Sequence, residues 1–354
     1  MKKILLTTIV FATCLGANAQ TKQSDQSDKK RTDDLKQFMT KILGTKVDVP
    51  KGSFVFDISK SPELLLNVPV FDKTFNQLYF DGKVASSNDF TPLIKNGTWL
   101  PDLGVNLNWN KFITTYTSFY IDTISTKYEG DVEKASINDA ARIFWLWLNL
   151  KAGYNYATLE TYNNDLTLLN KDKFTKENLN SFVSKTDLNF YFFPSGRFLK
   201  FFSIIGKAGF EYKTNDHNYS SLKSVNIKNF ETITDSNGKT MEVSSDTKRV
   251  KEGKLIVKNT ASINYNLMTL FSISKTFYIG LSTYGKQTLT KDLKSLDAGF
   301  GVTVPVTKNE KDIASLTLKY EIPDIKDNIS NIPIKEKGIL GFSIGVPINP
   351  FGRN

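Results

Sequence analysis

The chain has 354 residues, with 46 Lys and Arg against 36 Asp and Glu, one cysteine and one histidine. The basic excess is spread along the whole length, without runs of lysine and arginine interleaved with aromatic residues, so nucleic-acid binding is not indicated. One cysteine excludes a disulfide framework within the chain. With one histidine and no calcium-loop spacing, the sequence predicts neither a metal nor another cofactor.

The first twenty residues have the features of a secretory signal peptide. Lys2 and Lys3 precede an apolar run of 13 residues, and the tripeptide that ends at Ala19 has the small-x-small pattern read by signal peptidase. The run is shorter than the roughly 20 residues of a membrane-spanning helix. We therefore expect cleavage after Ala19. A short membrane anchor and a lipoprotein site at Cys14 are the alternatives.

The segment 20–51 differs from everything that follows it. Residues 21–31 are polar and should be flexible. Apolar residues then recur at helical spacing over 32–43, with Thr32 as a plausible N-cap and Gly44 as a stop, which predicts a short amphipathic helix. Such a helix packs on its own domain, plugs a barrel or makes a periplasmic contact. A β-domain is predicted over 52–354.

From Ser53 onward apolar residues recur at every second position, the period of a β-strand. In 314–323, for example, Leu316, Leu318, Tyr320 and Ile322 share one face. We predict about twelve strands, within a range of 10 to 14. Their ranges are 53–60, 75–84, 101–109, 112–123, 142–160, 185–194, 198–213, 259–267, 275–287, 294–306, 314–323 and 338–348.

Two of these strands carry the same eight-residue pattern, GFGVTVPV (299–306) and GFSIGVPI (341–348). Each has one bulky apolar face and one face of small residues, and each ends near a proline, which suits a strand end. No charge interrupts the apolar faces, although one near the middle of a bilayer would cost about 2–4 kcal/mol. We expect these side chains to face lipid: Phe300, Val302, Val304, Leu316, Leu318, Phe342, Ile344 and Val346. The core of an exported soluble β-sandwich would look similar and is an alternative.

The connections between the predicted strands alternate in length. Those at 307–312 and 194–197 are tight, whereas 161–184 and 214–253 are long. The dipeptide 110–111 reads as a tight turn where the alternation requires a long loop. A missed or extra strand between 53 and 142 would resolve this conflict.

With these features, residues 53–348 resemble Gram-negative outer-membrane β-barrels of the porin-like kind. The resemblance implies an all-β, up-and-down antiparallel transmembrane barrel in the outer membrane, surrounded by lipid. It also implies interfacial aromatic residues near strand ends, for which the candidates are Trp99, Trp109, Trp145, Trp147, Phe193, Tyr212, Phe271 and Tyr278. Many such barrels end on an aromatic residue, but here three residues follow Phe351.

Because side chains alternate between the two faces of a strand, every second residue of each predicted strand faces the interior, a rule that we call strand parity. It assigns a mixed set of charges and amides to the interior of such a barrel. The lumen-lining candidates are Asp102, Asn106, Asn108, Asp187, Asn189, Lys207, Glu211, Lys258, Asn264, Asn266, Asp297, Lys319 and Glu321. A twelve-stranded barrel lies between side-chain-filled and open sizes, so the lumen is either open or plugged. The first hypothesis is a porin-like channel for small solutes, with no catalytic residue.

Two other functions remain possible for the same fold. A barrel-embedded hydrolase would use His217, which lies beside Asp216, Ser220 and Ser221. An assembly or adhesion protein would act through the segment 214–253, where Asn237-Gly238 predicts the turn of a hairpin. The sequence names neither a protein partner nor a solute.

Overall fold

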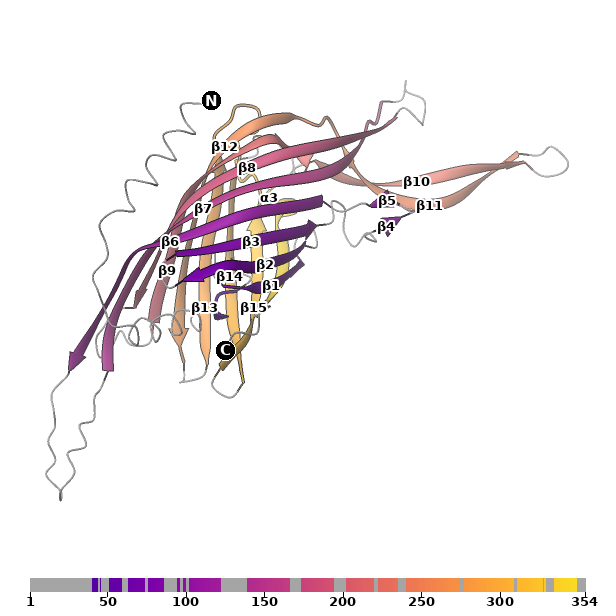
Figure 1. Cartoon of the computed structure of the whole chain (residues 1–354). Coiled ribbons are helices and arrows are strands. Elements are labelled where there is room, and N and C mark those ends of the chain that lie inside the picture. Colours follow the sequence, from indigo (N-terminus) through magenta and orange to yellow (C-terminus); the bar gives the residue numbers. More distant parts are fainter. Residues whose placement is uncertain are drawn as a thin grey trace, which may run out of the picture.

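The chain folds almost wholly into antiparallel strands, as the computed structural model shows (Figure 1). The structure describes residues 40–43, 45, 51–58, 63–73, 76–85, 94–95, 98–99, 102–121, 139–165, 173–193, 202–219, 222–234, 240–273, 277–308, 311–326, 328 and 334–348. The predicted signal peptide and most of the predicted helix at 32–43 lie outside these residues. Among the described residues, no helix is long and apolar enough to cross a membrane.

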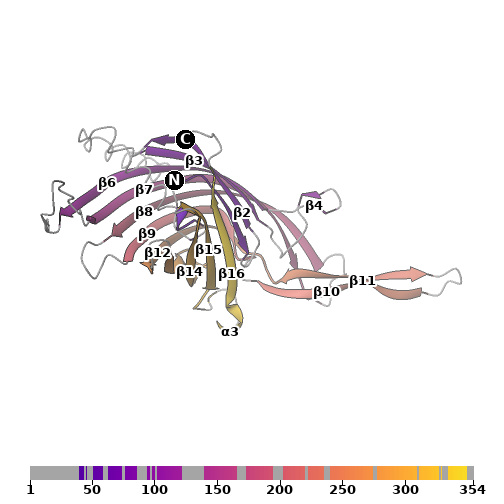
Figure 2. The same ribbon diagram turned by 90° about the horizontal axis from the view of Figure 1, so that it is seen from below.

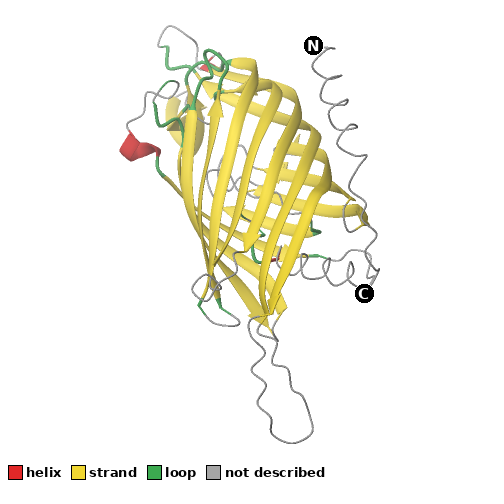
Figure 3. Ribbon diagram, turned by 90° about the vertical axis from the view of Figure 1, so that its left-hand side faces the viewer, coloured by secondary structure: helices red, strands yellow, loops and turns green. Residues whose placement is uncertain are grey.

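Twelve of the strands close into a barrel, as predicted. In spatial order they are β1 (Ser53–Ile58), β2 (Glu63–Lys73), β3 (Asn76–Ala85), β6 (Asp102–Ile121), β7 (Asp139–Tyr162), β8 (Phe174–Phe193), β9 (Phe202–His217), β12 (Val257–Ser272), β13 (Tyr278–Thr288), β14 (Leu296–Lys308), β15 (Lys311–Ile322) and β16 (Ile339–Pro347). Each strand pairs antiparallel with the next, and β1 pairs with β16 to close the ring. Figure 3 shows the tilted strands as one continuous wall.

The barrel has two different ends. The chain enters β1 at Ser53 and leaves β16 at Pro347 on the same side, which we call the inner end. The shortest connections lie there: two residues separate β2 from β3, and two separate β14 from β15. At the opposite, outer end, the connection between β15 and β16 contains the one-turn helix α3 (Ile334–Lys337). The lysine at the end of this helix, Lys337, donates to the carbonyl oxygen of Asp324 at 2.7 Å.

A hairpin of two further strands leaves the barrel at the outer end. It consists of β10 (Lys223–Thr234) and β11 (Thr240–Glu252), and β11 meets β7 only through two parallel register pairs. Figures 1 and 2 show this ribbon projecting away from the wall. The hairpin predicted between residues 214 and 253 is therefore present, although its Asn237-Gly238 turn lies outside the described residues. A second small pair, β4 (Ile94–Lys95) and β5 (Thr98–Trp99), is separate from the barrel.

Side chains alternate between the two faces of the barrel wall, as the period of two requires. On β14 and β15 the outward residues Phe300 and Leu318 are 58% and 51% exposed, whereas the inward Thr303 is fully buried. Cross-strand register places Leu318 between Val302 and Phe342, and Leu316 between Val304 and Ile344. The eight residues expected to face lipid, Val346 included, thus lie in adjoining rows on the outward face of three neighbouring strands.

The predicted number of strands was right because two errors compensated. The strand β2, with sequence ELLLNVPVFDK, was missed. The predicted strands 101–109 and 112–123 are one strand, β6, which runs through the presumed turn at 110–111. The side chain of Asn110 instead accepts a hydrogen bond from the amide of Asn149 at 2.8 Å. No turn is therefore needed at 110–111, although the connection between β6 and β7, at the inner end, is longer than a tight turn.

A third difference concerns β8, which begins at Phe174 rather than near residue 185. Its first half, predicted as part of a long loop, pairs with the outer half of β7 from Tyr162 to Gly153. The paired strands β7 and β8 are 24 and 20 residues long, about twice the 9–11 residues that a tilted strand needs to cross a bilayer. They therefore extend the wall beyond the membrane.

Candidate functional site

The inner end of the lumen is occupied by the chain's own residues Thr40–Leu43, the only described part of the predicted helix. Ile42 and Leu43 are 0% and 1% exposed. Ile42 belongs to an apolar cluster with Phe112, Trp145, Trp147, Tyr191, Ile205, Met268 and Leu270, which come from β6, β7, β8, β9 and β12. We call residues 40–43 and 45 the floor segment, because they lie across the lumen beneath the cavity described below.

Polar contacts fix the floor segment to the opposite wall. The ammonium of Lys41 pairs with the carboxylate of Asp312 on β15 at 2.6 Å, and lies 4.2 Å from the ring centre of Tyr278 on β13. The hydroxyl of Ser315 donates to the carbonyl oxygen of Leu43. The segment therefore contacts strands on both sides of the lumen, by apolar packing on one side and polar contacts on the other.

Small inward residues of β14, β15 and β16 line this second wall, those of β14 and β16 from the repeated pattern. Thr303, Thr317 and Ser343 are register partners across β14, β15 and β16, and all three are buried. The hydroxyls of Thr303 and Thr317 lie 3.0 Å apart and form a hydrogen bond. Bulky residues fill the wall opposite, so small residues on this side leave the floor segment its room in the lumen.

Above the floor segment, the barrel encloses a cavity of about 690 Å³. Leu43 and Thr45 lie at its base. Its charged lining residues are Asp57, Glu63, Asp81, Lys83, Lys151, Lys185, Lys207, Glu211, Lys286, Asp297, Lys319 and Glu321, and its asparagines are Asn67, Asn106, Asn108, Asn110, Asn149 and Asn264. Carboxylates and lysines are thus equal in number, so the lining as a whole carries no charge bias.

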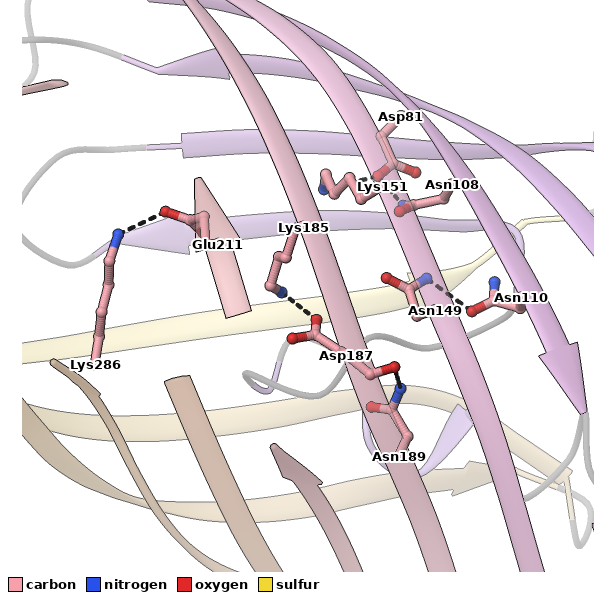
Figure 4. A network of polar contacts seen from close by, with 10 residues as sticks. All are labelled: Asp81, Asn108, Asn110, Asn149, Lys151, Lys185, Asp187, Asn189, Glu211 and Lys286. Atoms are coloured by element: carbon pink, nitrogen blue, oxygen red, sulfur yellow. Dashed lines mark hydrogen bonds and ion pairs between the residues drawn. The ribbon is translucent and has the colours of Figure 1, made fainter. Parts of the chain in front are cut away.

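Hydrogen bonds and ion pairs connect these side chains across neighbouring strands (Figure 4). Asp81 on β3 accepts from both the ammonium of Lys151 on β7, at 3.0 Å, and the amide of Asn108 on β6. Lys286 on β13 donates to Glu211 on β9 at 2.7 Å. The polar lining is therefore a connected network rather than a set of isolated charges.

Close backbone approach makes part of this network possible. Asp187 is fully buried and pairs with Lys185 at 2.6 Å, and its carboxylate lies over Gly209 on the adjacent strand. A Cβ atom at Gly209 would collide with that carboxylate and approach the backbone oxygen of Thr186. A residue larger than glycine therefore does not fit at this position.

The structure brings most of the predicted lumen residues to one place. Eight of them line the cavity: Asn106, Asn108, Lys207, Glu211, Asn264, Asp297, Lys319 and Glu321. Asp187, Asn189 and Asn266 are buried in the wall. Lys258 instead pairs with the exposed Asp292 at the outer end, and Asp102, the first residue of β6, lies off the cavity lining. Strand parity would also have found Asp81 and Lys83, which lie on the predicted strand 75–84.

The prediction of interfacial aromatic residues was wrong for Trp145 and Trp147. They are 5% and 0% exposed and pack around Ile42 inside the barrel. Phe193 packs against the same cluster, and Tyr278 contacts Lys41. By contrast, Phe271 is exposed on the outer surface, and Trp109 and Tyr212 are partly exposed. The side chain of Trp99 lies outside the described residues.

His217, the hydrolase candidate, is the last residue of β9. The neighbouring carboxylate of Asp216 accepts hydrogen bonds from Lys213 at 2.7 Å and from the hydroxyl of Thr260 at 2.8 Å. The ring of His217 lies edge-on to Tyr219, with centroids 6.3 Å apart. Ser220 and Ser221, the other members of this candidate, lie outside the described residues. Within the described part of the chain, no group of acidic, histidine or cysteine side chains is arranged to hold a metal ion.

No protein-family model matches the chain, and no curated protein sequence matches it. Among solved structures, the NanC porin is similar, with 7% identity, 84% of this chain and 99% of that chain covered, and a TM-score of 0.38. The beta domain of the Bordetella autotransporter BrkA has 10% identity over 84% of this chain and 100% of that chain, with a TM-score of 0.37. The CymD monoaromatic hydrocarbon channel has 9% identity over 94% and 95%, with a TM-score of 0.34.

The barrel's own surface identifies its environment. Its outward face carries exposed large apolar residues on every side, among them Phe80, Leu107, Phe210, Leu267 and Leu318. A closed barrel satisfies all of its backbone hydrogen bonds internally, which is the condition for strands to span a bilayer. An apolar outside around a polar inside is the arrangement of outer-membrane barrels. The chain is therefore a twelve-stranded transmembrane β-barrel of the outer membrane.

Proposed function

We propose that this barrel is a channel for small solutes and that its floor segment closes the inner end. The cavity of about 690 Å³ inside the wall, lined by lysines, carboxylates and asparagines, is the observation that carries the proposal. Charged groups of this density are costly in a dry interior and suit a lumen that holds water. A water-filled cavity inside a membrane-spanning wall serves for passage when its closed end opens.

The closure depends on a small number of contacts. Ile42 packs into the aromatic wall, Lys41 pairs with Asp312, and Ser315 bonds the backbone at Leu43. Lys41, Ile42 and Leu43 belong to no strand of the barrel, so displacement of the floor segment leaves the strands of the wall paired. Solute passage then requires the segment to leave the lumen, not the barrel to unfold.

The substitution Ile42→Asp tests this function in the full-length protein. A carboxylate at this position would be buried among Trp147, Met268 and Leu270, which is strongly unfavourable, so the floor segment should leave the lumen. In planar bilayers, the refolded variant is expected to conduct at least tenfold more than the unsubstituted protein. Ile42→Leu is the matched control, because it keeps an apolar side chain of the same volume among the same residues.

Two results would contradict the proposal. A folded Ile42→Asp barrel that does not conduct would exclude a channel. Equal conductance of the unsubstituted protein, Ile42→Asp and Ile42→Leu would keep the channel and exclude the closure. Folding of each variant is checked by the difference in gel mobility between boiled and unboiled samples.

The ribbon of β10 and β11 favours a second function, attachment of an external partner. It projects from the outer end of the barrel and meets β7 through two register pairs only (Figure 2). Replacing residues 224–251 by a short glycine-serine linker should abolish such attachment and leave conductance unchanged. Partner binding that survives the replacement would remove this candidate.

A further inference from the structure

The charges around the cavity are sorted by strand. We divide the barrel into an acidic half, formed by the adjacent strands β14, β15, β16, β1, β2 and β3, and a basic half, formed by β6, β7, β8, β9, β12 and β13. The acidic half contributes five lining carboxylates, Asp57, Glu63, Asp81, Asp297 and Glu321, against two lysines. The basic half contributes four lining lysines, Lys151, Lys185, Lys207 and Lys286, against one carboxylate.

Among the described lining residues, one ion pair connects the two halves and the others lie within a half, so the asymmetry remains. At one junction, Lys151 on β7 reaches Asp81 on β3 at 3.0 Å. Within the basic half, Lys286 pairs with Glu211 at 2.7 Å and Lys185 with the buried Asp187 at 2.6 Å. The two lysines of the acidic half pair within it, Lys319 with Asp57 and Lys83 with Glu63. Opposite walls of the cavity therefore carry opposite excess charge.

Neutral hydrogen-bonding groups are also unevenly placed. Five of the six lining asparagines lie on the basic half: Asn106, Asn108, Asn110, Asn149 and Asn264. Carboxamide N–H groups donate hydrogen bonds to carboxylates and carbonyls, as lysine ammonium groups do. The basic half is therefore suited to the carboxylate end, and to any amide, of a solute.

We propose that the cavity selects small zwitterions that carry an amino group and a carboxylate, such as amino acids and short peptides. This inference rests on the proposed channel function and names its substrate class. The solute's ammonium faces the acidic half, near Glu321 and Asp297, and its carboxylate faces the basic half, near Lys207. Both ends can then exchange hydration for charge-assisted hydrogen bonds.

Other solutes of similar size fit this arrangement less well. A simple cation or anion is attracted by one wall and repelled by the other, so the gain at one side is offset. An apolar solute would displace water from charged groups without replacing their hydrogen bonds. A cavity of about 690 Å³ lies within the range of small-molecule sites, which run to about 1,000 Å³, so the size itself suits a small molecule.

A comparison of four probes on the unsubstituted protein tests the inference. The probes are the zwitterion glycylglycine, the cation glycinamide, the anion N-acetylglycine and neutral glycerol, each titrated calorimetrically into the refolded barrel in detergent. Glycylglycine should bind with a Kd at least tenfold below that of each other probe. Equal binding of all four, or a preference for either single charge, would overturn the proposal.

Substitutions then locate the site. Glu321→Gln and Lys207→Gln should each raise the Kd for glycylglycine at least fivefold, since each removes one charge from the lining. Asp292→Asn is the matched control, because it removes a carboxylate exposed at the outer end. An equal loss in Asp292→Asn would overturn the assignment to the cavity.

The failure of this inference and that of the channel are distinguishable. Flux of all four probes through Ile42→Asp without discrimination would keep the channel and reject zwitterion selection. If the protein binds glycylglycine tightly but its Ile42→Asp variant does not conduct, the channel is rejected and the binding site is kept.

Discussion

The hydroxyl of Ser315 on β15 donates a hydrogen bond to the backbone carbonyl of Leu43, which precedes the first strand of the barrel. This contact joins residues 272 positions apart in the chain. It uses a small inward residue of the barrel wall, where a larger side chain would displace the floor segment. The contact is thus a direct link between the small-residue face of the barrel and the closure of its lumen.

A disulfide between Leu43→Cys and Ser315→Cys is expected to form on mild oxidation, because the two residues are in contact in the lumen. The cross-linked peptides should appear by mass spectrometry, and in an Ile42→Asp barrel the disulfide should hold conductance at the closed level until a reductant is added. Leu43→Cys paired with Ser262→Cys on β12 is the control and should not cross-link, since Ser262 pairs with Thr288 at the outer part of the wall. Absence of the first disulfide would contradict the position of the floor segment.

Tryptophan fluorescence should report departure of the floor segment. Trp145 and Trp147 pack around Ile42, so Ile42→Asp should admit water and shift their emission to longer wavelength. The shift should vanish when both tryptophans are replaced by phenylalanine, because the partly exposed Trp109 is outside the cluster. An unchanged emission maximum in a folded, conducting Ile42→Asp barrel would show that this cluster does not hold the closure.

A charge in the centre of the lipid-facing surface should destabilise the barrel. Leu318 is 51% exposed and lies between Val302 and Phe342, so Leu318→Arg should lower the free energy of unfolding in lipid vesicles by about 2–4 kcal/mol. Leu289→Arg, just beyond the outer end of β13, should cost about 0–1 kcal/mol. Equal losses in denaturant titrations would contradict the assignment of the Leu318 face to the membrane.

The substitution Gly209→Ala should destabilise the wall, because the new methyl group would occupy the space of the Asp187 carboxylate. Overpacking of this kind costs about 1–3 kcal/mol. Gly82→Ala is the matched control, since a Cβ atom there has no other atom within 4 Å, and it should leave the unfolding midpoint nearly unchanged. A tolerated Gly209→Ala would mean that Asp187 can leave the network at little cost.

Much of the barrel could be predicted from the alternation of apolar and small or polar residues, which is local. The strand β2 escaped prediction because three consecutive leucines and Pro69 hide its alternation, and the register shifts between Pro69 and Phe71. The division of β6 at 110–111 came from two polar residues that read as a turn. In the structure Asn110 faces a partner, Asn149, that is 39 positions away.

The candidate site was only partly predictable for a related reason. Strand parity finds inward charges, and eight of the thirteen candidates do line the cavity. Parity could not place Trp145 and Trp147, because the strand around them is apolar on both faces. What makes their inward face apolar is Ile42, about a hundred positions earlier in the sequence. A contact at that distance leaves no local pattern.

The ribbon of β10 and β11 has a mechanical consequence. Thirteen residues of β11 at about 3.3 Å each extend it by about 40 Å. At its β11 end, it joins the barrel through Lys251 and Glu252 beside β7, and through Gly253, whose φ of 125° favours glycine. The ribbon is therefore attached to the barrel through few residues, and a force applied to the ribbon acts on the rim of the barrel at the outer end of β7.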